Sequence, residues 1–126
     1  MFVSRRTFTG SAALALLGAC AGTGDGRATM EEAFGLIGEI KAAAGRGEEL
    51  VRYLIEGSRA MPGNLAYIVA QSQSDPDSVW ISEVWRTRTD HEASLKLPQV
   101  QAAIARARPI IAGFGQRVET RPVVLD

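Results

Sequence analysis

The strand-like run Val79–Trp85 (VWISEVW) constrains the fold more than any other part of the chain. β-Branched and aromatic residues in alternation are typical of a half-buried strand. The next segment has the pattern of a helix start and carries His91, the only histidine of the 126 residues. We therefore predict a strand-to-helix corner at which a carboxylate, two indoles and an imidazole lie close together.

Three further segments have the composition of strands. Residues 33–42 alternate weakly between apolar and small side chains. In residues 65–70, the odd-numbered and the even-numbered positions are both apolar. The first is predicted to be a strand, and the second a strand buried on both sides. A last strand is predicted at residues 116–124, after a turn at Gly113–Gly115, with Pro122 at a sheet edge.

Three segments have the periodicity of helices. One begins at Glu48, and its inward face is predicted to hold Leu50, Val51, Leu54, Ile55 and Met61. The second covers residues 89–97, with Thr89 as its cap and Glu92 three residues later. The third covers residues 99–108 and is opened by Pro98, with a buried face of Val100, Ala103, Ile104 and Ala107.

Taken with the run at 79–86, the order is strand, helix, strand, strand, helical region, strand. This order predicts an α+β fold, a ferredoxin-like β-α-β-β-α-β sandwich with its helices on one face of an antiparallel sheet. The opposite face of such an apolar sheet would be exposed in a monomer. We therefore expect a second copy of the chain to cover it, in a homodimer.

The N-terminal 20 residues have the features of a bacterial export signal. Arg5 and Arg6 precede a short apolar run, which is shorter than the roughly 20 residues that span a bilayer. The arginine pair resembles a twin-arginine signal, and the stretch 17–20 (LGAC) resembles a lipobox with Cys20 as the acylated residue. The alternative is cleavage after Ala21.

These features predict residues 1–20 as the signal, 21–31 as a tether and 32–126 as the globular domain. The protein is then expected outside the cytoplasm, in the periplasm or at the cell surface, attached to a membrane through Cys20. Cys20 is the only cysteine, so a disulfide within the chain is excluded.

The charge balance argues against nucleic acid as a partner. Without Arg5 and Arg6 the chain carries 12 basic and 14 acidic residues, and no basic patch is evident. No group of His, Cys, Asp and Glu has the spacing of metal ligands, so no bound metal is predicted.

Several short motifs in one order resemble the antibiotic biosynthesis monooxygenase family. They are Gly45-x-x-Glu48-Glu49-Leu50, the stretch 62–67 (PGNLAY), Glu83-Val84-Trp85, His91-x-x-Ser94-Leu95, Leu97-Pro98 and Ala112-Gly113-Phe114. The resemblance covers residues 34–124. It implies a dimeric α/β barrel, a cavity between sheet and helices in each subunit, and oxidation of an electron-rich aromatic by molecular oxygen without metal, flavin or other cofactor.

Three positions depart from the pattern of that family. Ser94 and Gln99 stand where many members have histidines, and Ile81 stands where the anthrone oxygenases have asparagine. His91 lies one helical turn before Ser94, so the imidazole is predicted to be relocated rather than lost.

The candidate catalytic residues are His91, Trp85 and Glu83. His91 is the candidate base; a helix start favours its neutral form, whereas Asp90 and Glu92 favour the charged one. Trp85 offers a flat wall and an indole N–H to an aromatic substrate, although ordinary core packing is the alternative. Glu83 lies on the same strand face and needs a partner there.

Glu83 is expected to orient a donor, or to pair with Arg108 or Arg117. Ser94 is expected to share a hydrogen bond with the imidazole. The predicted substrate contacts are Trp85, Ser94, Ile81, Tyr67 and Phe114.

Three functions fit these residues. The first is a cofactor-independent monooxygenase acting on a quinol-like or polyphenolic substrate with oxygen. The second is a non-catalytic dimer that binds a small hydrophobic ligand in the same cavity. The third is haem binding or degradation, with His91 as the only imidazole available.

Overall fold

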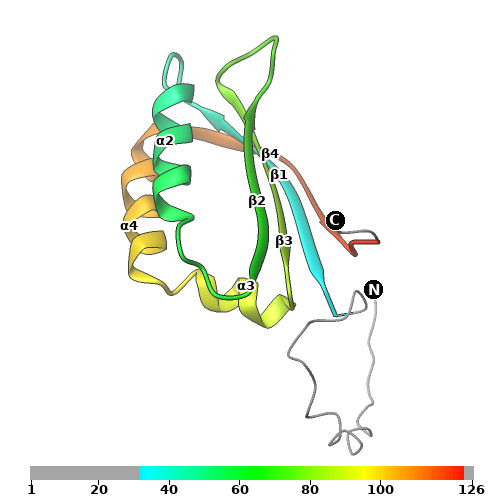
Figure 1. The fold of residues 1–126 in the computed structure, drawn as a ribbon. Helices are drawn as coiled ribbons and strands as arrows, with labels where there is room; N and C mark the ends of the chain where they lie inside the picture. The colour runs from blue at the N-terminus through cyan, green and yellow to red at the C-terminus, as the bar shows by residue number, and fades with distance from the viewer. Residues whose placement is uncertain (1–31, 124–126) are drawn as a thin grey trace, which may run out of the picture.

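Four antiparallel strands and three α-helices form the domain, and the computed structural model describes residues 32–123 (Figure 1). The strands are β1 (Phe34–Ala42), β2 (Asn64–Gln71), β3 (Ser78–Trp85) and β4 (Ile111–Thr120). The helices are α2 (Gly47–Gly57), α3 (Arg88–Ser94) and α4 (Pro98–Ala107), and the 3-10 turn η2 (Arg108–Ile110) follows α4. The predicted signal, tether and Cys20 lie outside the described residues.

The sheet has the order β2-β3-β1-β4, with every neighbouring pair antiparallel. Helices α2 and α4 lie side by side over one face, and α3 lies at the end of β3 (Figure 1). This confirms the predicted ferredoxin-like α+β fold. Among residues 32–123, no helix has both the length and the apolar character needed to cross a bilayer.

The core lies between the sheet and the two long helices. Leu50 of α2 and Val79 of β3 are fully buried in a cluster with Ala42, Ala107 and Ile110. A second cluster, at the other end of the sheet, holds Phe34, Leu36 and Trp85, with Met61 packed against it. Helix α2 ends at Gly57, so Met61 reaches the core from the segment after the helix and not, as was predicted, from its inward face. Ile55 is exposed and does not belong to that face either.

The face of the sheet opposite the helices carries a largely apolar row. Val118, Ile37, Ser82 and Ile68 form one row across β4, β1, β3 and β2 in register. Ile68 is 59% exposed and Leu65 is exposed as well, so β2 is not buried on both sides in the single chain, contrary to the prediction. Only one of its two apolar sets faces the helices.

The last strand begins five residues earlier than predicted. Gly113, Phe114 and Gly115 do not form a turn but lie within β4, where Gly113 pairs with Lys41 and Phe114 with Ile40. Register shifts in the β1–β4 ladder accommodate the extra residues, and glycines tolerate such bulges. The strand ends at Thr120, so Pro122 follows it rather than lying at a sheet edge.

The start of α3 also differs from the prediction. Thr87, not Thr89, is the cap, and its Oγ1 accepts the N–H of Asp90 at 3.1 Å. Because β3 ends at Trp85, Thr87 is still in the extended conformation that a cap needs, and Thr89 is already helical.

The end of α3 is earlier as well. The helix stops at Ser94 rather than near Leu97, and Leu97 adopts an extended conformation before Pro98. As predicted, Pro98 is the first residue of the next helix.

Candidate active site

A cavity of about 550 Å³ lies between the sheet and the helices, in the position that the family resemblance implied. This volume is typical of sites that enclose a small organic ligand. Most of its lining is apolar, from Leu54, Val100 and Ile104 on the helices to Ile40 and Ile111 on the sheet. The polar side chains of the lining are Ser58, Tyr67, Glu83, His91, Ser94 and Arg108.

Glu83 and Trp85 face the cavity from β3 and are linked to each other. The indole N–H of Trp85 donates to Oε1 of Glu83 at 2.7 Å. Glu83 therefore orients a donor, which was one of the two roles expected for it. Its carboxylate does not pair with Arg108 or Arg117, which was the other expected role. The indole N–H is consequently engaged within the protein, so Trp85 offers a ligand its ring but not the donor that was predicted.

His91 lies beside this pair. Its Nε2 atom is 3.8 Å from Oε1 of Glu83, and both side chains are only 12% exposed. The His91 ring packs edge-on against Trp85, with centroids 5.5 Å apart, and at a tilt against Phe34, at 5.2 Å. The strand-to-helix corner thus brings the three predicted catalytic residues together.

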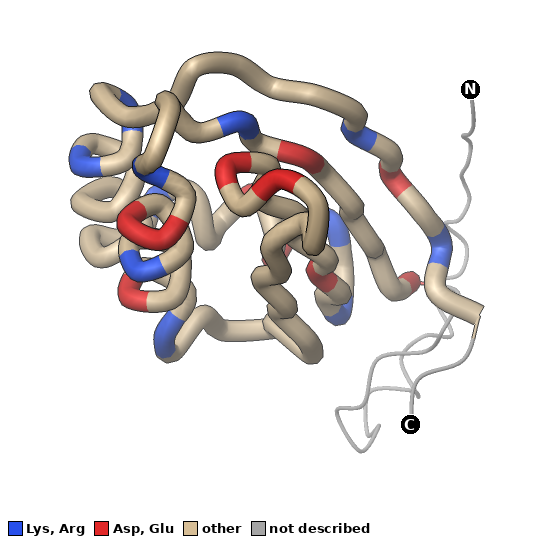
Figure 2. Tube along the Cα trace, turned by 90° about the horizontal axis from the view of Figure 1, so that it is seen from above, with Lys and Arg blue, Asp and Glu red and all other residues tan. Residues whose placement is uncertain are grey.

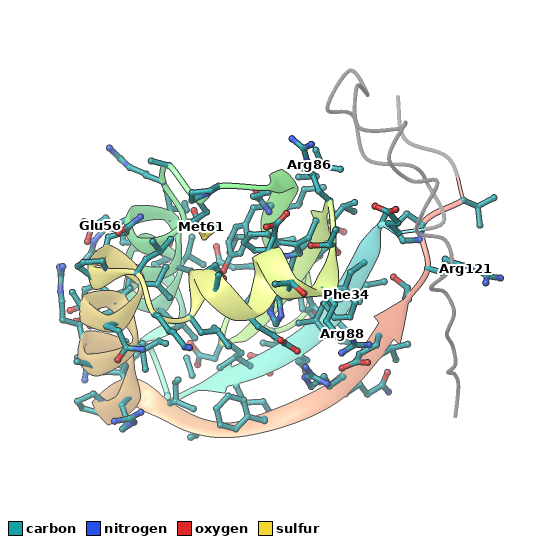
Figure 3. The ribbon with its side chains drawn as sticks, turned by 90° about the horizontal axis from the view of Figure 1, so that it is seen from below. Phe34, Glu56, Met61, Arg86, Arg88 and Arg121 are labelled. Atoms are coloured by element: carbon teal, nitrogen blue, oxygen red, sulfur yellow. The ribbon has the colours of Figure 1, made fainter. Side chains whose placement is uncertain are left out.

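Phe34 was missed by the sequence analysis. It starts β1 and pairs with Trp85 on β3, which places its ring against His91. The guanidinium of Arg88 lies 4.4 Å from the Phe34 ring (Figure 3). It also pairs with Glu119. Neither Phe34 nor Arg88 lines the cavity, so this contact holds the imidazole without occupying space that a ligand would use.

Tyr67 contributes a hydroxyl to the same end of the cavity. It is the register partner of Glu83 on β2. Burial, together with the charge of Glu83, raises the pKa of Tyr67 well above its ordinary value, so the phenol stays neutral. Its O–H has no hydrogen-bond partner among residues 32–123 and is available to a ligand.

The other predicted contacts divide into two groups. Phe114 and Ser94 line the cavity, and Phe114 is 74% exposed, at its edge. The Ser94 hydroxyl donates to the carbonyl of His91 at 2.6 Å and does not bond the imidazole, which corrects that expectation. Ile81 is buried on the same sheet face but is not part of the lining.

Gln99, which stands in place of a family histidine, has a structural contact. Its side-chain amide donates to the carbonyl of Arg59 at 2.9 Å and so joins α4 to the segment after α2. Gln99 does not line the cavity.

Arg108, which the sequence analysis considered as a partner for Glu83, is exposed to solvent and also lines the cavity. The signal that was available is its position directly before Pro109, where the helix has to end. Acidic and basic residues are intermixed over the described chain (Figure 2). Residues 32–123 contain no group of three or more His, Cys, Asp or Glu side chains that would hold a metal ion.

The sequence of this domain matches the model of one protein family, described as antibiotic biosynthesis monooxygenase (ABM), over residues 33–106. The chain belongs to this family. The matched residues of the ABM domain include all three members of the Glu83, Trp85 and His91 cluster. No curated protein matches the chain.

Solved structures agree with this assignment. A protein from Chloroflexus aurantiacus, provisionally named an antibiotic biosynthesis monooxygenase, is 47% identical, with a TM-score of 0.74. The match covers 75% of this chain and 97% of that one. A protein from Bacteroides thetaiotaomicron with the same provisional name is 18% identical and shares the fold, with a TM-score of 0.69 over 76% and 94% of the two chains.

Proposed function

We propose that this ABM domain is a monooxygenase that oxidises a quinol-like or polyphenolic aromatic substrate with molecular oxygen and without a cofactor. One oxygen atom enters a ring C–H position, and the other leaves as water. The substrate supplies all four electrons, so a quinol becomes a hydroxyquinone and no external reductant is needed. The observation that carries this proposal is the Glu83–His91 pair inside an apolar cavity.

The pair has the properties of a proton acceptor for a phenolic hydroxyl. Oxygen reacts faster with the anion of a phenol than with the phenol itself, because the anion gives up an electron more easily. The Trp85 N–H engages Oε1 of Glu83, which leaves Oε2 free to accept the hydroxyl proton or to hold it toward His91. Tyr67, which stays neutral, donates to the second substrate oxygen.

Oxygen uptake by purified residues 32–126 tests the activity, over a panel of reduced naphthoquinols and anthrones. We expect uptake above autoxidation, reduced about 10²-fold or more by His91→Ala. Arg106→Ala is the matched control, because Arg106 pairs with Glu56 outside the cavity and its loss leaves the reaction unchanged.

Two other outcomes would overturn the proposal. Tight binding of oxidised quinones without any oxygen uptake would indicate a non-catalytic ligand-binding protein. A sharp Soret band on haem titration that His91→Ala abolishes, together with no quinol oxidation, would indicate haem binding.

We also propose that two copies associate through the open face of the sheet. Ile37, Ile68 and Val118 are 41–59% exposed there and form part of one row across all four strands. Burial of this apolar row would stabilise a dimer. Sedimentation is expected to give a dimer that Ile68→Asp dissociates; a monomeric wild-type protein would contradict this.

The export and anchoring predictions remain proposals for residues 1–31. The lipobox-like stretch before Cys20 supports acylation of that cysteine. Full-length protein is expected in the membrane fraction, and Cys20→Ala is expected to release it. Retention of the variant in that fraction would count against the anchor.

A further inference from the structure

The cavity is polar at both ends and apolar between them. Glu83, His91 and Tyr67 gather at one end. At the other end lies Arg108, the first residue of η2, which leads directly into β4. Arg108 is the only lysine or arginine among the residues that line the cavity.

The sheet register gives the separation of the two ends. Glu83 is level with Leu36 on β1, whereas Ile111, which directly follows η2, is level with Ala42. Six residues of strand correspond to about 20 Å between these backbone positions. A ligand that contacts both ends is therefore longer than a single aromatic ring.

Arg108 has no acidic partner among residues 32–123. Four other arginines do, namely Arg46 with Glu49, Arg88 with Glu119, Arg106 with Glu56 and Arg117 with Glu119. Arg52 and Arg59 form no such pair either, but neither of them lines the cavity. Arg108 is thus a solvent-exposed cation at the edge of an apolar cavity, and its guanidinium is not engaged by a carboxylate of the described chain. A guanidinium in such a place binds a carboxylate through two parallel hydrogen bonds.

We propose that Arg108 selects substrates that carry a carboxylate at the end opposite the reacting hydroxyl. The ligand is then an extended, polycyclic or tail-bearing aromatic acid. Its hydroxyl lies at Glu83 and His91, its rings lie along Trp85 and the apolar helix residues, and its carboxylate lies at Arg108. That the hydroxyl end reacts with oxygen rests on the proposed function, but the recognition of the acid does not.

Calorimetric titration with two oxidised, unreactive ligands separates the two proposals. Anthraquinone-2-carboxylate and its neutral carboxamide have the same rings and differ in charge. The wild-type domain is expected to bind the acid at least tenfold more tightly, and Arg108→Gln is expected to remove this preference. Arg108→Lys, which keeps the charge but not the planar fork, is expected to retain part of it.

Arg106→Gln is the matched control, two residues away on α4 and paired with Glu56. It is expected to keep the full preference for the acid. Equal affinity of the wild-type domain for both ligands, no binding of either, or an undiminished preference in Arg108→Gln would overturn the proposal. Preference for the acid without oxygen uptake would overturn the proposed function and leave the role of Arg108 intact.

Discussion

Two carboxylates on opposite faces of the sheet have nearly the same surroundings, yet only one has the features of a reactive group. Glu83 and Glu39 are both 12% exposed, and each is linked to a tryptophan of β3. Trp85 donates directly to Glu83. On the other face, Trp80 donates to the Ser78 hydroxyl at 3.1 Å, which in turn donates to Glu39 at 2.5 Å.

What differs is the rest of the environment. Glu39 has a cation beside it, Lys41 at 3.7 Å, and does not line the cavity. Glu83 lines the cavity, has an imidazole beside it, and has no lysine or arginine partner among the described residues. Burial and an indole partner therefore do not mark a site by themselves. A carboxylate that lines an apolar cavity beside an imidazole does.

The largest expected difference between the two carboxylates is in activity. Glu83→Gln keeps an acceptor for the Trp85 N–H but removes the negative charge, so the oxidation rate of a naphthoquinol should fall about 10²-fold. Glu39→Gln is the matched control and should leave the rate near the wild-type value. Oxygen-uptake kinetics measure both, and equal losses would show that the two faces are not functionally different.

A smaller difference is expected in stability. Trp85→Phe removes a hydrogen bond to a charged group, and such bonds contribute about 1.5–3 kcal/mol. Trp80→Phe removes a bond between neutral groups, which contributes about 0.5–1.5 kcal/mol. Urea unfolding at one protein concentration compares the two free energies of unfolding. An equal or greater loss in Trp80→Phe would contradict the comparison.

The smallest effect is expected at Gly115, next to Glu39. A Cβ atom at this position would overlap the Glu39 carboxylate, which then has to turn away from Ser78. Gly115→Ala should cost about 1 kcal/mol in the free energy of unfolding. Gly113→Ala is the control, since a Cβ there meets no atom within 4 Å.

A double-mutant cycle attributes this cost to the contact. In the background of Glu39→Ala, the substitution Gly115→Ala should cost less, because the overlapping group is gone. Additive effects would place the cost in the backbone of β4 instead.

The sequence was sufficient for the fold because strand alternation and helix periodicity are local signals. It was less reliable where two local signals competed. Thr87 and Thr89 each precede an acidic residue by three positions, and only the end of β3 at Trp85 decides between them. The glycines at 113 and 115 are typical of a turn, but pairing with β1 overrides that preference.

The site was predictable in part for the same reason. Glu83, Trp85 and His91 are near neighbours in sequence, so strand alternation and the following helix start were enough to group them. Phe34 and Arg108 reach the cavity only through tertiary structure, one by pairing of β1 with β3 and the other at the end of α4. The local sequence of Phe34 does not indicate this proximity, and that of Arg108 gives only the helix end before Pro109.

The two tryptophans on opposite faces of β3 also give the domain two intrinsic fluorophores in different surroundings. They are the only tryptophans of the chain. The Trp80→Phe protein emits from Trp85 alone, which is buried against the cavity, so its emission follows ligand occupancy. The Trp85→Phe protein emits from Trp80 on the open face, so its emission follows association with a second copy. The two processes can thus be observed separately without adding a label.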